Sequence, residues 1–455
     1  MWPSNAGGRC YHYAAQFRRR ACTQLDAQYD EAREFTTILC RLETTQNPLA
    51  RHIQLHVQCT KPGTHYIAND LKERKTFTSN TLRLTTLFMQ LTMFLNPSAA
   101  SYTYTGSPPS PHVLPFHRLL PDYAATPLHP LSSLAQSLGL AYIFVKDESN
   151  RFGLPAFKIL GASWATFKAV AAACDVRLEE GVGVEEVGAA ARKSGVRIVT
   201  CTAGNWGRAV ARMGKLMRID VTVFVPGTMD ESTQEKIRSE GTTVDVVDGD
   251  YDEAVRTARR EAEGKGSVLM MDTGWEGYEE IPQWVVEGYS TMLTETDQQL
   301  RQHGVGPVTH AIASVGVGSW AQAVAMHYKS TTPSAVVVAV EPDTAACLRT
   351  SLEAGKITPI TTGNSIMNGM NCGTVSYTAW EVLRHGVDAC VDVTDTEAHL
   401  DLQYLHTQGV KNGPCGAAPV SALRKLVSEK KLGLGKDSVV VLFSTEGARD
   451  YPVPA

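Results

Sequence analysis

Hydrophobic positions fall into short continuous runs from residue 140 onward. Seven runs rich in β-branched residues predict β-strands, at residues 142–146, 197–201, 221–225, 267–271, 309–315, 335–340 and 438–443. Continuous rather than alternating apolar runs are expected where helices cover both faces of a sheet. Stretches with helical periodicity lie between the runs, including 159–174, 207–217 and 251–263. This alternation predicts an α/β fold with mostly parallel sheets.

The first hundred residues differ from the rest of the chain. They hold twelve Lys and Arg against seven Asp and Glu, and strand and helix signals do not alternate. A Pro/Ser-rich segment at 107–112 then predicts a linker. We expect residues 1–108 to form an atypical, disordered N-terminal extension. Two alternatives stay open, an Arg-rich and acid-poor organelle-targeting segment and upstream sequence that does not belong to the chain.

Composition narrows the classes of function. The 455 residues are 43% hydrophobic and 20% charged with a formal net charge of −4, which is typical of soluble globular proteins and excludes fibrous chains. This charge gives no overall attraction to nucleic acid or to an anionic membrane. The longest apolar stretch, at 84–95, is too short to span a bilayer. We therefore expect a small neutral or zwitterionic partner.

Ten cysteines are present, but no pair has the C-x-x-C spacing of a zinc site or a redox motif. We expect no metal site. A chain of this length with no signal-peptide pattern does not need a disulfide framework, so the cysteines indicate reduced thiols in the cytoplasm.

Candidate chemistry lies at strand-to-helix turns, because ligands in α/β folds bind at the carboxyl ends of strands. Lys158 follows a Gly/Pro-rich loop and precedes an apolar helix. Burial would lower the pKa of its ammonium, and a neutral amine can form a Schiff base with an aldehyde. The alternative is an ordinary helix-start lysine whose charge reaches water.

In a second turn, Asn205 lies between Gly204 and Gly207. Its amide would bond a ring oxygen, or it is simply a turn former.

Two further turns follow later strands. Gly316, Val317, Gly318 and Ser319 run into a helix, where successive backbone N–H groups would hold a phosphate. The same turn, with Ala321 and with Glu341 on the next strand, also fits a dinucleotide fingerprint. Ser444 and Thr445 end the last strand, and their hydroxyls could face a heteroaromatic nitrogen.

In chain order, the four turns resemble the fold-type II pyridoxal-phosphate enzymes, which are tryptophan synthase β-like. Five longer blocks are similar to the diaminopropionate ammonia-lyase family, at 146–158, 271–292, 340–348, 365–376 and 413–418. The resemblance runs from Phe116 to Glu446. It implies a homodimer whose subunits have two α/β domains with the cofactor, pyridoxal 5′-phosphate, in the cleft between them. The larger domain would comprise 109–165 and 303–455, and the smaller, mobile domain 166–302.

The resemblance also assigns roles to residues. Lys158 would carry the cofactor as a Schiff base, and Asn205 would bond its ring oxygen. The segment from Gly316 to Ser319 would bind its phosphate, and Ser444 or Thr445 would meet its pyridine nitrogen. Asp272 matches a family carboxylate near the substrate, although a strand-end acid satisfied by neighbouring amides is the plainer alternative.

One block departs from the family pattern D-G-N-H-G. Ala203 stands where the family has an acid that resembles the base for the D-enantiomer, and Trp206 stands where it has a histidine. Alanine cannot accept a proton. We expect Trp206 to add bulk at the cleft, which bears on the choice of substrate.

The resemblance implies a carbon-nitrogen lyase that performs α,β-elimination on an amino acid, 2,3-diaminopropionate, to give pyruvate and ammonia. Alternatives with the same cofactor are a β-replacement synthase and a serine/threonine dehydratase-like enzyme. Alternatives from other classes are an NAD-dependent oxidoreductase, which leaves Lys158 unexplained, and a catalytically silent binding protein.

Overall fold

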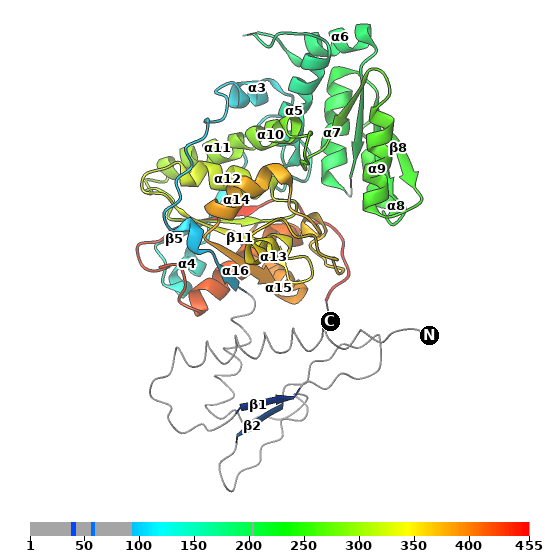
Figure 1. The fold of residues 1–455 in the computed structure, drawn as a ribbon. Coiled ribbons are helices and arrows are strands. Elements are labelled where there is room, and N and C mark those ends of the chain that lie inside the picture. The colour runs from blue at the N-terminus through cyan, green and yellow to red at the C-terminus, as the bar shows by residue number, and fades with distance from the viewer. Residues whose placement is uncertain (1–37, 42–55, 60–92, 180, 203, 455) are drawn as a thin grey trace, which may run out of the picture. The chain divides into compact units, whose positions relative to one another are not determined.

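The structure is a computed structural model that describes residues 38–41, 56–59 and 93–454, except residues 180 and 203. The chain divides into two units, Met1–Leu84 and Thr85–Ala455. In the first unit, β1 (Ile38–Arg41) and β2 (His56–Cys59) pair antiparallel. The second unit carries all the strands and helices predicted from the sequence (Figure 1).

Seven strands of the second unit form one sheet in the order β3-β12-β11-β10-β13-β5-β4. The five inner strands are parallel, whereas β3 pairs antiparallel with β12 and β4 with β5. Because β10, β13 and β5 are neighbours, the turns that follow them meet at one edge of the sheet. The strands are β3 (Met93–Leu95), β4 (Leu128–Pro130), β5 (Tyr142–Asp147), β10 (His310–Ser314), β11 (Val336–Pro342), β12 (Ala389–Val393) and β13 (Val439–Ser444).

A second sheet has four parallel strands in the order β8-β7-β6-β9. They are β6 (Arg197–Cys201), β7 (Val221–Pro226), β8 (Thr243–Val247) and β9 (Ser267–Met270). All seven predicted strands are confirmed, as is the α/β fold with mostly parallel sheets. In this unit the strands β3, β4, β8 and β12 were not predicted from the sequence.

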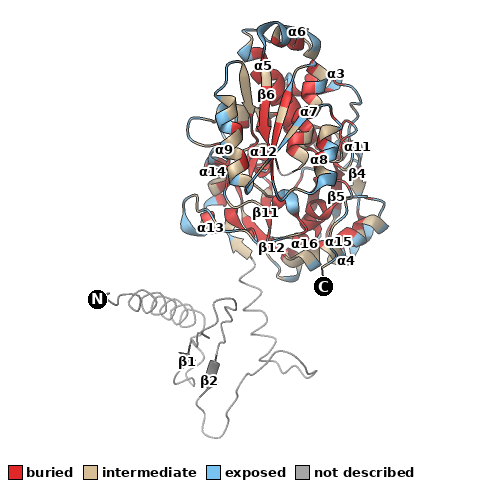
Figure 2. Ribbon diagram, turned by 90° about the vertical axis from the view of Figure 1, so that its right-hand side faces the viewer, coloured by how far each residue is buried: buried red, intermediate tan, exposed pale blue. Residues whose placement is uncertain are grey.

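Alternate residues of β11 show that both faces of the larger sheet are covered. Val338 packs in one apolar cluster with Leu423 of α16 (Pro414–Ser428). Val337 packs in another cluster with Val324 of α12 (Ser319–Lys329). This two-sided burial explains the continuous apolar runs in the sequence. Figure 2 shows the strand interiors in red.

The other helices surround the two sheets, and α5 contacts α7, α10 and β9. The predicted helices are confirmed as α5, α7 and α9. Among the described residues, no helix is long and apolar enough to cross a membrane. The other elements are α3 (Val113–Leu119), α4 (Ser132–Leu138), α5 (Lys158–Ala173), α6 (Val184–Ser194), α7 (Asn205–Met217), α8 (Glu231–Arg238), α9 (Tyr251–Ala262), α10 (Glu280–Gly288), α11 (Ser290–Gln302), α13 (Cys347–Ala354), α14 (Tyr377–Gly386) and α15 (Asp395–Thr407), with 3₁₀ turns η2 (Pro97–Ala99) and η3 (Asn368–Met370).

The end of the expected N-terminal extension belongs to the larger sheet. β3 pairs with β12, and the side-chain amide of Asn96 donates to the carbonyls of Arg384 (3.0 Å) and Val387 (2.8 Å). The predicted boundary at residue 108 is therefore too late, because a three-residue edge strand gives almost no sequence signal. Apart from β1 and β2, the expectation for residues 1–92 falls outside the described residues.

Candidate active site

The loop before Lys158 rests on a fully buried cluster of charges. Arg151 is 0% exposed, and it donates to both oxygens of Glu295 and of Glu148 at 2.7–2.9 Å. Lys146 also donates to Glu295, at 2.9 Å. Two cations thus face two carboxylates, which keeps the cluster neutral where water is excluded. The cluster fixes the backbone that leads to Lys158.

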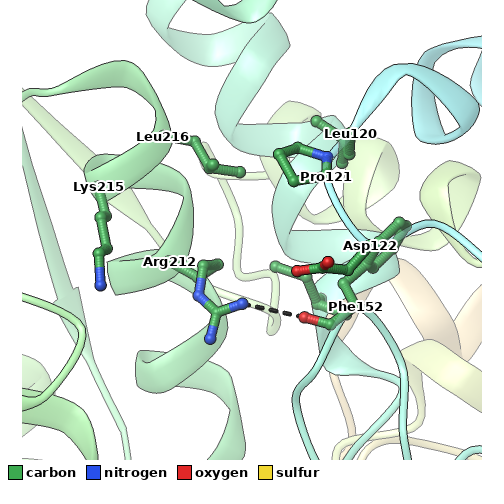
Figure 3. A pocket seen from close by; sticks show the side chains of 8 residues that line it. Leu120, Pro121, Asp122, Phe152, Arg212, Lys215 and Leu216 are labelled. Carbon is green, nitrogen blue, oxygen red and sulfur yellow. Dashed lines mark hydrogen bonds between the residues drawn. The ribbon is translucent and has the colours of Figure 1, made fainter.

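Two residues of this loop adopt left-handed backbone angles, Phe152 with φ 54° and Gly153 with φ 72°. Arg212 of α7 donates to the Phe152 carbonyl at 2.9 Å, as Figure 3 shows. The loop is therefore tied both to the buried charges beneath it and to a helix that packs on the smaller sheet.

Lys158 begins α5, and its ammonium is paired with the carboxylate of Asp272, which follows β9. Their side chains are 21% and 9% exposed. Burial by itself lowers the pKa of Lys158, but the Asp272 carboxylate outweighs it and holds that pKa above its ordinary value. The predicted lowering of the Lys158 pKa is therefore wrong for the free amine. The sequence around Lys158 could not show this, because Asp272 lies 114 residues further along the chain.

The turn after β10 passes close to neighbouring segments. A Cβ on Gly316 would lie 2.8 Å from the carbonyl oxygen of Gly369. Gly318 has φ 97°, and a Cβ there would lie 2.8 Å from Leu383 Cδ1. Larger residues would therefore strain or displace this turn.

Backbone N–H groups at this turn are free to bind a ligand. Those of Gly316, Gly318 and Ser319 donate to no acceptor in the part of the chain that the structure describes. The Val317 carbonyl accepts from the Ser376 N–H at 2.8 Å, so the Gly318 N–H, on the same trans peptide unit, points away from Ser376. With the N-terminus of α12 at Ser319, the turn has the donor set and the dipole direction that suit a phosphate.

Ser444 and Thr445 lie beside the lysine loop. Ser444 ends β13 opposite Asp147 of β5, and the N–H of Phe157 donates to the Thr445 carbonyl at 3.3 Å. The Ser444 hydroxyl is buried and has no hydrogen-bond partner among the described residues. An unpaired buried hydroxyl at this place suits a polar atom of a ligand.

Asn205 begins α7 at the carboxyl end of β6, next to the strand that Asp272 follows. Trp206 is 4% exposed, and its indole N–H donates to Thr200 Oγ1 (3.0 Å) and to the Met270 carbonyl (3.2 Å). The expectation that Trp206 adds bulk at the cleft is therefore wrong, because the start of α7 turns this side chain into the core of the smaller sheet. Ala203 lies outside the described residues.

A hollow of about 220 Å³ opens between the loops near α3 and helix α7 (Figure 3). None of the predicted site residues lines it, so it is separate from the candidate site. Its lining comprises Leu120, Pro121, Asp122, Phe152, Ile159, Arg212, Lys215 and Leu216.

Comparison with known proteins agrees with this geometry. Residues 119–445 match the family model of the pyridoxal-phosphate dependent enzymes. Diaminopropionate ammonia-lyase of Salmonella typhimurium is 35% identical over 74% of this chain and 88% of its own length. The chain belongs to the diaminopropionate ammonia-lyase family of pyridoxal-phosphate dependent enzymes. The Escherichia coli (strain K12) relative is 32% identical over 74% of this chain and 87% of its own length.

Solved ammonia-lyase structures are also similar. The Escherichia coli enzyme in complex with D-serine has 30% sequence identity and a TM-score of 0.70, over 78% of this chain and 93% of that one. The same enzyme with an aminoacrylate-PLP azomethine reaction intermediate has 29% identity and a TM-score of 0.68, over the same shares. The resemblance seen in the sequence, the fold-type II architecture and the pyridoxal-phosphate dependence are thereby confirmed.

The surroundings of Glu341 count against the alternative that the turn at Gly316 binds a dinucleotide. Its carboxylate is 0% exposed and accepts from the N–H groups of Leu348 (2.7 Å) and Arg349 (2.8 Å) at the start of α13. Burial raises its pKa to about 8. Both of its oxygens already accept from the start of α13, so the carboxylate is engaged within the fold rather than left free for a ribose.

An aromatic group beneath Lys158 was not predicted from the sequence. The rings of Phe157 and Tyr289 lie 4.9 Å apart, and Trp320 lies 5.8 Å from Tyr289. Burial raises the pKa of Tyr289 well above its ordinary value. Tyr289 falls in the 271–292 block that carries the family resemblance, so the block was the available signal.

Proposed function

We propose that this chain catalyses the elimination of ammonia from 2,3-diaminopropionate. With one water, one substrate molecule gives one pyruvate and two ammonia, because the aminoacrylate released first is hydrolysed. The observation that carries the proposal is the ion pair of Lys158 and Asp272 at the site of a chain that belongs to the ammonia-lyase family.

The side chains present fit pyridoxal phosphate. Lys158 would bind its aldehyde carbon, the turn from Gly316 to Ser319 its phosphate, and Asn205 its ring oxygen. The orphaned hydroxyl supports Ser444 rather than Thr445 as the partner of the pyridine nitrogen. When bound, the cofactor supplies an electron sink for negative charge at the substrate α-carbon.

Side chains of the protein, Lys158 and Asp272, would carry out the proton transfers. The Lys158 amine, when it is not bound to the cofactor, would remove the α-proton of the substrate. Asp272 is within hydrogen-bond reach of Lys158 Nζ, so a proton held between the two groups can be delivered to the departing β-amine, which leaves poorly unless protonated. In the free protein the Asp272 carboxylate raises the pKa of Lys158 above its ordinary value, which shows that the pair can hold a proton.

We propose that the enzyme prefers the L-enantiomer of its substrate, because Ala203 stands where the family has an acid. The α-protons of the two enantiomers lie on opposite faces of the bound substrate, and Lys158 serves only one face. Without the acid found in relatives, the other face lacks its base, and general-base help is worth about 10² to 10⁴ in rate. Burial of Trp206 in the core leaves the loss of this acid as the only change in the block that concerns the site.

The family resemblance also supports a homodimer, with a small amino acid as the substrate. Cytoplasmic location is proposed from the cysteines, and Cys174, Cys201, Cys347, Cys372, Cys390 and Cys415 are free thiols in the structure. Sedimentation of the purified protein tests the dimer, and imaging of a full-length fluorescent fusion tests the location. A monomer at working concentration, or an organellar signal, would contradict the respective proposal.

The central experiment measures products from each enantiomer of 2,3-diaminopropionate with the reconstituted enzyme. We expect two ammonia per pyruvate, and a rate for the D-isomer lower by about 10² to 10⁴. Ala203→Asp should restore part of the D-activity, whereas the similarly sized Ala203→Asn should not. Equal wild-type rates would mean that another residue supplies the second base. Trapping of added thiol in a new amino acid, without pyruvate, would instead indicate β-replacement.

A further inference from the structure

Three buried polar atoms without a partner lie together beside β13. Ser444 Oγ and both amide atoms of Asn412 are buried and make no hydrogen bond within residues 93–454 as described. A Cβ on Gly416 would lie 2.5 Å from Ser444 Oγ and 3.2 Å from Asn412 Nδ2. The two side chains therefore lie against the same glycine of α16.

The backbone holds Asn412 in this place. Asn412 forms an antiparallel bridge with Gly447, and its carbonyl accepts from His406 Nε2 at 2.8 Å. The next residue, Gly413, donates its N–H to the Glu446 carbonyl at 3.0 Å. The carboxamide can turn about its own bonds, but it cannot leave the neighbourhood of Ser444.

An apolar residue would fill this space at a lower cost in folding free energy than an asparagine. Buried amides in native proteins nearly always have a hydrogen-bond partner, and leaving one unpaired is costly. Asn412 is 0% exposed, so bulk water does not satisfy it. The grouping of its amide with the equally unpaired Ser444 hydroxyl indicates a shared role in binding.

We infer that Asn412 is a positioning residue for the pyridine nitrogen of the cofactor, an inference that rests on the proposed function. When its carboxamide turns toward Ser444, which has no partner in this structure, Asn412 Nδ2 would donate a hydrogen bond to Ser444 Oγ. The only hydroxyl proton of Ser444 is then directed to the ring nitrogen, whose lone pair accepts it. A nitrogen that accepts this bond stays unprotonated. Asn412 thereby sets the protonation state of the ring and strengthens its binding through Ser444.

The test measures cofactor affinity by titration of the apoenzyme, and the ring nitrogen by NMR with ¹⁵N-labelled pyridoxal phosphate. We expect Asn412→Leu, which is similar in size, to weaken affinity about 2- to 10-fold and to shift the ring-nitrogen resonance. Asn412→Ala gives a second variant with the same expectation. In a Ser444→Ala background, Asn412→Leu should change affinity less than about 2-fold, because its effect passes through Ser444.

Thr166→Val is the matched control, since Thr166 Oγ1 is also buried without a described partner but lies within α5. It should leave affinity and resonance unchanged. Equal cofactor affinity in wild type and Asn412→Leu would overturn the inference, as would equal losses in both backgrounds or a protonated ring nitrogen in the wild type. Failure of the wild type to bind pyridoxal phosphate through Lys158 would instead refute the proposed function.

Discussion

Replacing Glu295 by glutamine tests whether the buried charges hold the lysine loop. Glu295 accepts from Lys146 at 2.9 Å and from Arg151 at 2.7 and 2.9 Å, and its side chain is 2% exposed. Glutamine keeps the shape but removes the charge, and its amide presents N–H groups where only acceptors fit. Two cations would then share the single carboxylate of Glu148.

The expected loss of unfolding free energy is about 3 to 5 kcal/mol, the range for removing one partner of a buried ion pair. The exposed pair of Glu231 and Arg238 provides the control, because the Glu231 side chain is 76% exposed. Glu231→Gln should cost no more than about 1 kcal/mol. The loop leads directly to Lys158, so we expect Glu295→Gln to weaken cofactor retention as well.

Urea unfolding of both variants and the wild type, at matched cofactor concentration, measures these losses. Burial raises the pKa of Glu295, but Arg151 and Lys146 outweigh it and hold that pKa below its ordinary value. Its contribution is therefore present above about pH 4.3, where an unfolded glutamate titrates, and is lost as the pH falls through the lower folded value. Glu295→Gln should lack this part of the acid dependence. A loss within about 1 kcal/mol of the control would refute the reasoning.

Three further predictions concern the site and the N-terminus. Lys158→Ala should abolish pyruvate formation and borohydride fixation of the cofactor, and a fixed adduct on another lysine would contradict the assignment. Gly316→Val should weaken pyridoxal-phosphate affinity in a titration, because its side chain would meet Gly369; unchanged affinity with loss of NAD binding would favour the dinucleotide alternative. Removal of residues 1–84 should leave activity intact, whereas removal of 1–108 also takes away β3 and should lower the thermal unfolding temperature. An inactive or insoluble product of the shorter deletion would count against this.

The sequence predicted most of the strands that are buried on both faces and missed most of those that are not. Every residue of β10 and four of the five in β6 are buried, and each gave a continuous apolar run. The edge strand β8 is largely exposed and carries Asp245 at its centre. The inner strand β12 is fully buried, but Asp392 interrupts its run, and that carboxylate is paired with Arg349 from another element. Local pattern cannot show a partner that the fold brings from elsewhere.

The same limit applies to the site residues. Their positions at strand ends were predictable, because parallel strands deliver their carboxyl ends to one edge. The direction of Trp206 depended on the first turn of α7, and the unpaired state of Asn412 on where β13 ends beside α16. Neither the direction of Trp206 nor the unpaired state of Asn412 can be predicted from one segment of the sequence alone.

The charge of Lys158 likewise depends on a contact that exists only in the folded chain. Lys158 follows a loop that is anchored by the larger sheet, whereas Asp272 follows a strand of the smaller sheet. Their ion pair therefore exists only where the two sheets are held together, and it outweighs the burial that would otherwise favour a neutral amine. An increase in the separation of the sheets would weaken this pair before it disturbed either core. The charge state of the lysine is thus tied to the relative position of the two sheets, and the Arg212 bond to the Phe152 carbonyl is a second link between the lysine loop and a helix that packs on the smaller sheet.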